Sequence, residues 1–188
     1  IPASFNFNAR DQGATVLLPP AQAQKIMVMG GGNPSINAVH VIDTDAATPS
    51  YAAAPSMLRR RIHVNAVILP DRTVVATGGS GEAENALTAS TEAEIYDPAT
   101  NTWTTGARAR VARLYHSIAL LLPDARVLTA GSNPSRRNDE MRLEIYHPPY
   151  LFRGPRPCIE HVPERITLGA SFTVHVRDAG DIKRISLK

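Results

Sequence analysis

The sequence predicts an all-β fold: a partial kelch-type β-propeller, followed by the start of an Ig-like β-sandwich. Three observations predict it. Short apolar runs recur with a period of about 50 residues, small residues follow each second run, and Pro- or Gly-containing turns separate the runs. Runs this short, bounded by turn residues, favour strands over helices. A period near 50 with four strands per unit is typical of kelch blades.

Each of three predicted blades opens with two β-rich runs joined by a Pro-containing turn. The three segments run from 14–20 to 29–32, from 63–71 to 76–79, and from 116–124 to 129–132, with a second β-rich strand expected before the small residues that end each one. A third strand follows at 38–43, 93–97 and 143–147, and the second unit adds a short fourth strand at 102–104. Pro70 and Pro123 lie 53 positions apart by their numbering. The regular spacing favours blades over an unrelated sandwich with chance similarity.

Propellers typically close with four to eight blades, so we expect three blades to belong to a larger ring, most simply one of seven. We assign residues 1–152 to the C-terminal blades. Residues 153–188 form a Pro- and Gly-containing linker and the first strands of an incomplete second domain, at 159–162, 171–176 and 182–187. Three strands are too few for a stable sandwich, so the chain is interpreted as a fragment.

Composition excludes several other classes of function. The net charge is +3, and the short basic clusters at 59–61 and 136–137 have no interleaved aromatic residues, so a solvated rim is favoured over nucleic-acid binding. No apolar run approaches the roughly 20 residues of a membrane span. Cys158 is the single cysteine, which rules out a disulfide within the chain, and we expect it to be a packing residue. No signal peptide opens the sequence, so one would lie upstream.

Comparison of the repeats suggests a functional site. Positions set by the fold should recur in every blade, whereas positions that serve a site need not. At the entry to their first strands the blades carry Asp11-Gln12 (or Gln12-Gly13, depending on which proline is matched), Ile62-His63 and Tyr115-His116. Only the third offers an adjacent phenol and imidazole. The innermost strands of a propeller line its axis, so these segments should converge on one face.

A phenol and an imidazole together can bind copper. Imidazole is a good ligand for Cu(II), and a phenol becomes one when a metal lowers its pKa from about 10. Adjacent side chains of a regular strand point to opposite faces, so Tyr115 and His116 could share a metal only at an irregular strand end. The alternative is a core tyrosine beside a capping histidine. His63 aligns with His116 and is a candidate axis-lining residue, for which a structural role is favoured over metal binding.

The third blade resembles a known family. Residues 113–124 (RLYHSIALLLPD), 126–134 (RVLTAGSNP) and 148–151 (PPYL) are similar to the last blades of the glyoxal oxidase and galactose oxidase family, the copper radical oxidases. The tail from 156 onward is similar to the early-set Ig-like domain that follows the propeller in that family. The resemblance implies that Tyr115 and His116 bind copper, with Tyr115 as axial ligand and catalytic base. A tyrosine cross-linked to a cysteine and a further histidine should complete the site from outside this segment.

The resemblance also implies a function. The intact parent would be a secreted enzyme that oxidises aldehydes, primary alcohols or carbohydrates with O2 and releases H2O2, whereas this segment alone would be inactive. The alternative is a non-catalytic kelch propeller that binds a glycan or a protein partner. A correctly placed cysteine and tyrosine upstream would favour the oxidase.

Overall fold

The computed structural model describes residues 10–177, 180, 182 and 185. The chain divides into two compact units, Ile1–Pro148 and Pro149–Lys188. The described residues are all-β apart from three short 3₁₀ helices, η1 (Ala21–Ala23), η2 (Ala86–Thr88) and η3 (Pro149–Phe152). The predicted all-β class is confirmed.

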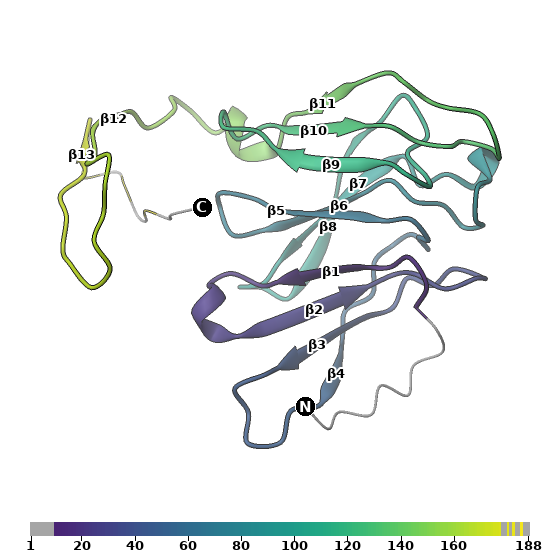
Figure 1. Ribbon diagram of the computed structural model, residues 1–188, viewed down its shortest axis with the longest axis horizontal. Helices are drawn as coiled ribbons and strands as arrows, with labels where there is room; N and C mark the ends of the chain where they lie inside the picture. The colour runs from purple at the N-terminus through teal and green to yellow at the C-terminus, as the bar shows by residue number, and fades with distance from the viewer. Residues whose placement is uncertain (1–9, 178–179, 181, 183–184, 186–188) are drawn as a thin grey trace. The chain divides into compact units, whose positions relative to one another are not determined.

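The first unit contains three antiparallel sheets in succession, with the strands of each sheet in chain order (Figure 1). The first is β1 (Ala14–Leu17), β2 (Lys25–Met29), β3 (Val39–Asp43) and β4 (Tyr51–Ala54). The second is β5 (Asn65–Ile68), β6 (Val74–Thr77), β7 (Glu92–Asp97) and β8 (Thr102–Arg108), and the third is β9 (Ile118–Leu121), β10 (Val127–Ala130) and β11 (Glu144–Tyr146). These are propeller blades, each built as an up-and-down meander. The sequence did not predict β4, and β8 is longer than the predicted 102–104.

The core lies between the first two sheets. Met27 and Met29 on β2 and Val74 on β6 are fully buried, and alternate residues of the neighbouring strands join the same cluster. Every residue of β6 is buried, because this strand belongs to the middle sheet and both of its faces are covered. Each such apolar side chain contributes about 1.5–3 kcal/mol to folding.

The third sheet has one face in contact with its neighbour and one face open. Leu120, Leu128 and Ile145 are cross-strand partners and therefore share a face. Leu120 is 52% exposed and Ile145 39% exposed. A row of exposed apolar side chains on a sheet is the kind of surface that a further sheet covers.

Glycines after the second strand let neighbouring blades approach closely. Gly30 and Gly78 have φ of +61° and +69°, and a Cβ on either would lie 2.6 Å from the carbonyl oxygen of Arg61 or Arg113 in the next blade. The residues that follow them donate hydrogen bonds to the same two oxygens, at 2.7 and 2.6 Å. The recurring small residues therefore form a close contact between blades that a side chain would prevent.

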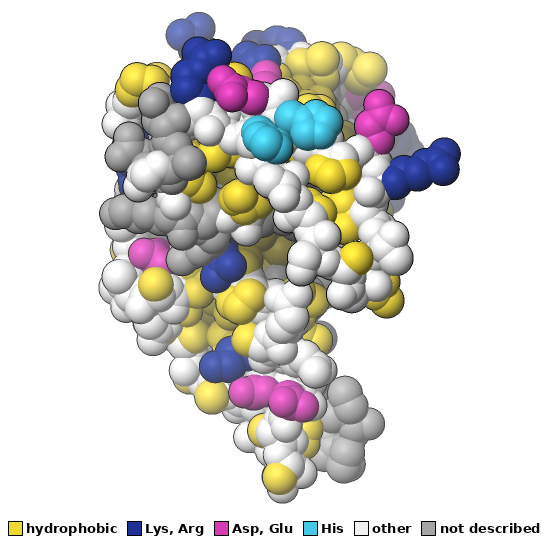
Figure 2. Space-filling view, turned by 90° about the vertical axis from the view of Figure 1, so that its left-hand side faces the viewer, with side chains coloured by type: hydrophobic (Ala, Val, Ile, Leu, Met, Phe, Trp, Pro, Cys, Tyr) yellow, Lys and Arg dark blue, Asp and Glu magenta, His cyan; other side chains and the backbone are white. Residues whose placement is uncertain are grey.

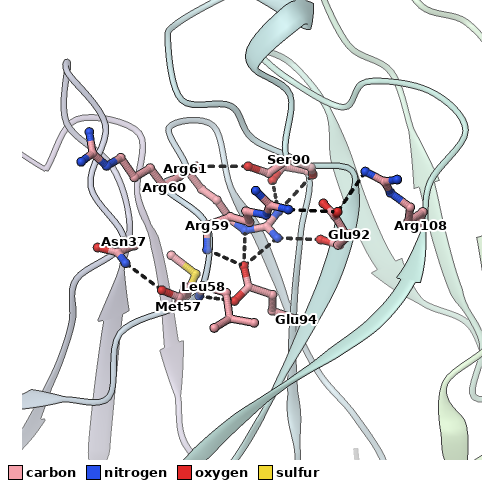
Figure 3. Close-up of polar contacts among 11 residues, drawn as sticks. Asn37, Met57, Leu58, Arg59, Arg60, Arg61, Ser90, Glu92, Glu94 and Arg108 are labelled. Carbon is pink, nitrogen blue, oxygen red and sulfur yellow. Dashed lines mark hydrogen bonds and ion pairs between the residues drawn. The ribbon is translucent and has the colours of Figure 1, made fainter.

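A buried ion pair joins the second approach segment to its own blade. We use "approach segment" for residues 10–13, 61–64 and 113–117, which precede β1, β5 and β9. Arg61 is fully buried and donates to Glu94 Oε1 from Nε at 3.1 Å and from Nη2 at 2.8 Å (Figure 3). Its Nη1 also donates to the carbonyls of Gly78 and Ser90. The backbone N–H of Leu58 donates to the other carboxylate oxygen of Glu94. The charges are therefore fully partnered, as a buried pair requires.

The other two blades repeat this arrangement with a variation. In the third, Arg113 donates to Gly131 O at 3.0 Å and to Glu144 at 3.3 Å. In the first, Arg10 lies 2.5 Å from Nδ1 of His40, whose place on the third strand corresponds to that of Glu94. Each arginine connects an approach segment to the third strand of its own sheet, and so stabilises the position of that segment.

The Arg10–His40 contact predicts a pH-dependent stability. Burial, and then the positive charge of Arg10, lower the pKa of His40 below its ordinary value near 6.5. The folded protein therefore binds fewer protons than the unfolded protein, so this contribution to the free energy of unfolding is complete above about pH 6.5 and is lost as the pH falls below it. His40→Gln keeps a hydrogen-bond acceptor that does not titrate, so we expect its free energy of unfolding to fall less than that of the wild type between pH 7.5 and 5. Urea denaturation at several pH values measures these free energies. If the two proteins lost stability in parallel as the pH fell, the prediction would be contradicted.

The second unit is sparsely packed. It contains η3 and one pair of strands, β12 (Ile159–His161) and β13 (His175–Val176). The predicted strand at 171–176 is thus reduced to its last two residues, and most of the one at 182–187 falls outside the described residues. Cys158 is exposed, so its prediction as a packing residue is wrong. The described residues of this unit are half-buried at most, and hence no core covers the thiol.

The remaining observations concern membrane spans and surface charge. No helix among the described residues is long and apolar enough to cross a membrane. On the face drawn in Figure 2, basic side chains occur in small groups next to acidic ones. This mixed surface agrees with the modest net charge.

Candidate functional site

The three approach segments share an unusual backbone conformation. Gln12, His63 and His116 each lie two residues before a first strand and have φ of +56°, +61° and +60°. The innermost strands therefore begin at Ala14, Asn65 and Ile118, and not at the predicted 63 and 116. A left-handed residue interrupts the regular strand ladder, which explains the later start. Since all three blades share it, the conformation belongs to the fold.

The third approach segment is one residue longer than the second. Four positions separate Arg61 from Asn65, the start of β5, whereas five separate Arg113 from Ile118, the start of β9. Tyr115 takes the place that Ile62 has in the second blade. Ile62 forms an isolated bridge with Ser80, and Tyr115 forms one with Asn133.

This irregular segment brings the rings of Tyr115 and His116 together. Their centroids are 3.7 Å apart and their planes are 29° apart, which is a stacked arrangement. On a regular strand the two side chains would point to opposite faces. Here both lie on one side of the chain, with Tyr115 half-buried and His116 exposed. The predicted irregular strand end is therefore present, and it lets one ligand reach both side chains.

His63 is the third member of the group. Its ring lies 5.2 Å from that of Tyr115 at an angle of 53°. The residue is 8% exposed, and its Nε2 has no hydrogen-bond partner among the described residues. Burial lowers the pKa of His63; the negative charges of Glu84 and Asp11 oppose this shift, and His116 adds to it.

A depression of about 330 Å³ adjoins His63 and Tyr115, whereas His116 is not among its lining residues. His63 and Tyr115 line it together with Asp11, Gln12, Glu84 and Arg136, and the remaining lining residues are Asn33, Ile62 and Ala83. Seven of the nine side chains are polar or charged. The depression thus suits a small polar molecule held next to the phenol of Tyr115.

The comparison of repeats identified Tyr115, His116 and His63 but missed Glu84 and Arg136. Both missed residues follow second strands, in loops that differ in length and composition between the blades. Such loops carry no periodic pattern, so only the folded chain shows that both residues line the same depression as His63 and Tyr115.

The chemistry of the donors is compatible with copper. Tyr115 offers a phenol oxygen and His116 an imidazole nitrogen on the same side of the chain, and both are suitable ligands for Cu(II). Among the described residues no group of three or more His, Cys, Asp or Glu side chains could hold a metal ion. Any metal held by Tyr115 and His116 would therefore need further ligands from outside the described residues.

Comparison with known proteins agrees with this description. The family described as "Glyoxal oxidase N-terminus" matches residues 13–150. "Aldehyde oxidase GLOX" of Vitis pseudoreticulata is 45% identical over 76 residues, which are 35% of this chain and 14% of that protein. "Galactose oxidase" of Gibberella zeae is 31% identical over 109 residues, which are 55% of this chain and 16% of that protein. The chain spans less than a fifth of the length of these relatives.

A solved structure extends the comparison to the fold. A fungal alcohol oxidase of the AA5 family, in complex with copper, superposes with a TM-score of 0.80 and 26% sequence identity, covering 93% of this chain and 40% of that one. The family match covers well over half of the chain and the structural match nearly all of it. The chain therefore belongs to the glyoxal oxidase N-terminus family, among the copper radical oxidases.

Proposed function

We propose that the protein that includes this chain oxidises aldehydes, primary alcohols or carbohydrates with O2, and that Tyr115 and His116 bind its copper. One observation carries the proposal. The rings of these adjacent residues stack at 3.7 Å on one side of the chain, and Tyr115 also lines a polar depression. The relatives named as aldehyde oxidase and galactose oxidase support the class of substrate.

The reaction is balanced as RCH2OH + O2 → RCHO + H2O2, and a hydrated aldehyde gives the carboxylic acid in the same way. Copper supplies one-electron and O2 chemistry when bound. Tyr115 would act as a base in its phenolate form, whose oxygen takes the proton of the substrate hydroxyl and becomes the neutral phenol. The imidazole of His116 stacks on the ring of Tyr115 and so restricts the orientation of the tyrosine side chain. The polar side chains of the depression bind the rest of the substrate.

Three further assignments complete the proposal. The remaining copper ligands, a tyrosine cross-linked to a cysteine and a histidine, lie in parts of the longer protein outside this chain. The exposed Leu120 and Ile145 fit contact with a further blade, so this chain is a piece of a larger ring, inactive by itself. The second unit is the start of an early-set Ig-like domain, and the parent enzyme is secreted.

Copper binding tests the proposal directly. In the full-length protein we expect about one copper per chain in the wild type and a substantial loss of bound copper in His116→Ala, because an imidazole nitrogen is removed from the ligand set. His147→Ala, which removes an exposed imidazole outside the depression, is the matched control and should retain full copper. Metal analysis of protein purified with copper and then dialysed measures this. A copper-replete His116→Ala protein would contradict the assignment.

A further inference from the structure

We propose that His63 is a substrate-binding residue, whose buried Nε2 forms a hydrogen bond with an oxygen of a small uncharged hydroxyl-bearing substrate in the depression beside Tyr115. This inference rests on the proposed oxidase function. It adds to that function a specific binding residue and the charge class of the substrate.

The first argument is the unpartnered nitrogen. His63 is 8% exposed, yet its Nε2 has no hydrogen-bond partner among the described residues. Buried polar atoms are nearly always paired, because one without a partner has lost its hydration and gained nothing in return. A ligand oxygen in the adjoining depression would restore that hydrogen bond.

The second argument separates the side chain from the backbone. The left-handed φ of His63 recurs at Gln12 and His116, so the fold imposes the conformation whatever the side chain. The side chain at this position differs from blade to blade. In the first two blades it is Gln12 and His63, and both of these side chains line the depression. Two neighbouring blades thus present polar groups from the same backbone position to the same space.

The third argument is proximity to Tyr115. The two rings are 5.2 Å apart and tilted by 53°, and both line the depression. A small molecule that accepts or donates a hydrogen bond at Nε2 is therefore held next to the phenol. Such a contact contributes to substrate binding equally in the ground state and the transition state, so its loss should raise KM more than it lowers kcat.

The charges around the depression select an uncharged molecule. Asp11 and Glu84 contribute two carboxylates, against one guanidinium from Arg136. Both carboxylates also interact electrostatically with His63. A substrate that carries a carboxylate would meet net negative charge here, whereas a polyol or a hydrated aldehyde would not.

The test compares glycerol with glycerate, which differ by one hydroxymethyl group replaced with a carboxylate. In the full-length, copper-loaded protein we expect KM for glycerate to exceed KM for glycerol about tenfold. Glu84→Gln removes one negative charge from the depression, so it should lower the ratio of KM for glycerate to KM for glycerol. His63→Phe keeps a flat ring against Tyr115 but removes Nε2. It should raise KM for glycerol about five- to tenfold, with kcat within about threefold and copper content unchanged.

Two variants control for structural effects. His63→Gln introduces the side chain that the first blade carries at the same backbone position, and it should retain most of the affinity for glycerol. His147→Phe makes the same chemical change on an exposed histidine outside the depression and should leave KM unaltered. Binding of glycerol to the copper-free protein, followed by ligand-observed NMR, should weaken in His63→Phe by a similar factor.

The outcomes are distinguishable. An unchanged KM and an unchanged glycerol affinity in His63→Phe would overturn the assignment, as would loss of copper from that variant or a preference for glycerate. If the wild type binds glycerol through His63 but releases no peroxide, the binding role stands and the oxidase function fails. If peroxide release is normal but insensitive to His63, the oxidase stands and this inference fails.

Discussion

Tyr115→Phe is expected to lower peroxide release by the full-length protein about 10²–10⁴-fold, the usual effect of losing a general base. The substitution removes one oxygen and keeps the ring that stacks on His116 at 3.7 Å. Since packing is conserved, the free energy of unfolding should change by less than about 1 kcal/mol. Peroxide release, copper content and thermal unfolding, measured on the same preparation, separate the chemical effect from the structural one.

Tyr51→Phe provides the matched control for this experiment. Tyr51 lies on β4, the last strand of the first sheet, away from the approach segments. Its substitution should leave turnover unchanged. If Tyr115→Phe retains full peroxide release, or if the intact wild type holds no copper, the oxidase function is refuted. A non-catalytic propeller that binds a glycan or a protein partner would then be the better description.

Glu94→Ala should lower the free energy of unfolding by about 3–5 kcal/mol, because it leaves the guanidinium of Arg61 buried without a counter-charge. The side chains of the pair are 0% and 1% exposed, so water cannot replace the lost carboxylate. The backbone N–H groups of Leu58 and Arg59 would lose their acceptor as well. Urea denaturation of wild type and variant under identical conditions measures the difference.

Arg108→Ala is the control for the ion-pair experiment. Arg108 pairs with Glu92 at 2.9 Å in the same blade, but its side chain is 71% exposed (Figure 3). Exposed pairs contribute at most about 1 kcal/mol, so this variant should be close to wild type. If Glu94→Ala were no more destabilising than Arg108→Ala, the buried pair would not be a main support of the blade.

The strands with clear hydrophobic patterns were well predicted. β1, β5 and β9 lie within the predicted first runs, and β2, β6 and β10 follow the predicted turns and lead into the predicted small residues. Short apolar runs between turn residues have few other ways to fold. β4 was missed, since its Tyr-Ala-Ala-Ala sequence has no alternation and it is an exposed edge strand. In the second unit, 171–176 has β-forming residues but only a two-residue ladder among the described residues, because strand pairing depends on partners that propensity does not reveal.

The residues of the candidate site divide in the same way, into those that the sequence indicated and those that it did not. Comparison of the repeats was enough to single out Tyr115, His116 and His63, because the sequence itself shows where one blade departs from its neighbours. It could not show that the first two rings stack, that Nε2 of His63 is buried without a partner, or that Glu84 and Arg136 lie beside them.

The sequence by itself thus determined the all-β class, the blade repeat and the residue types at the strand ends, since all of these depend on local periodicity. The tertiary structure alone decided which side chains line the depression beside Tyr115 and which arginines are buried against carboxylates. These features join residues tens of positions apart, such as Arg61 and Glu94 or His63 and Tyr115, through loops whose paths no local pattern specifies. Their energies depend on burial and on partners that exist only once the blades have packed together.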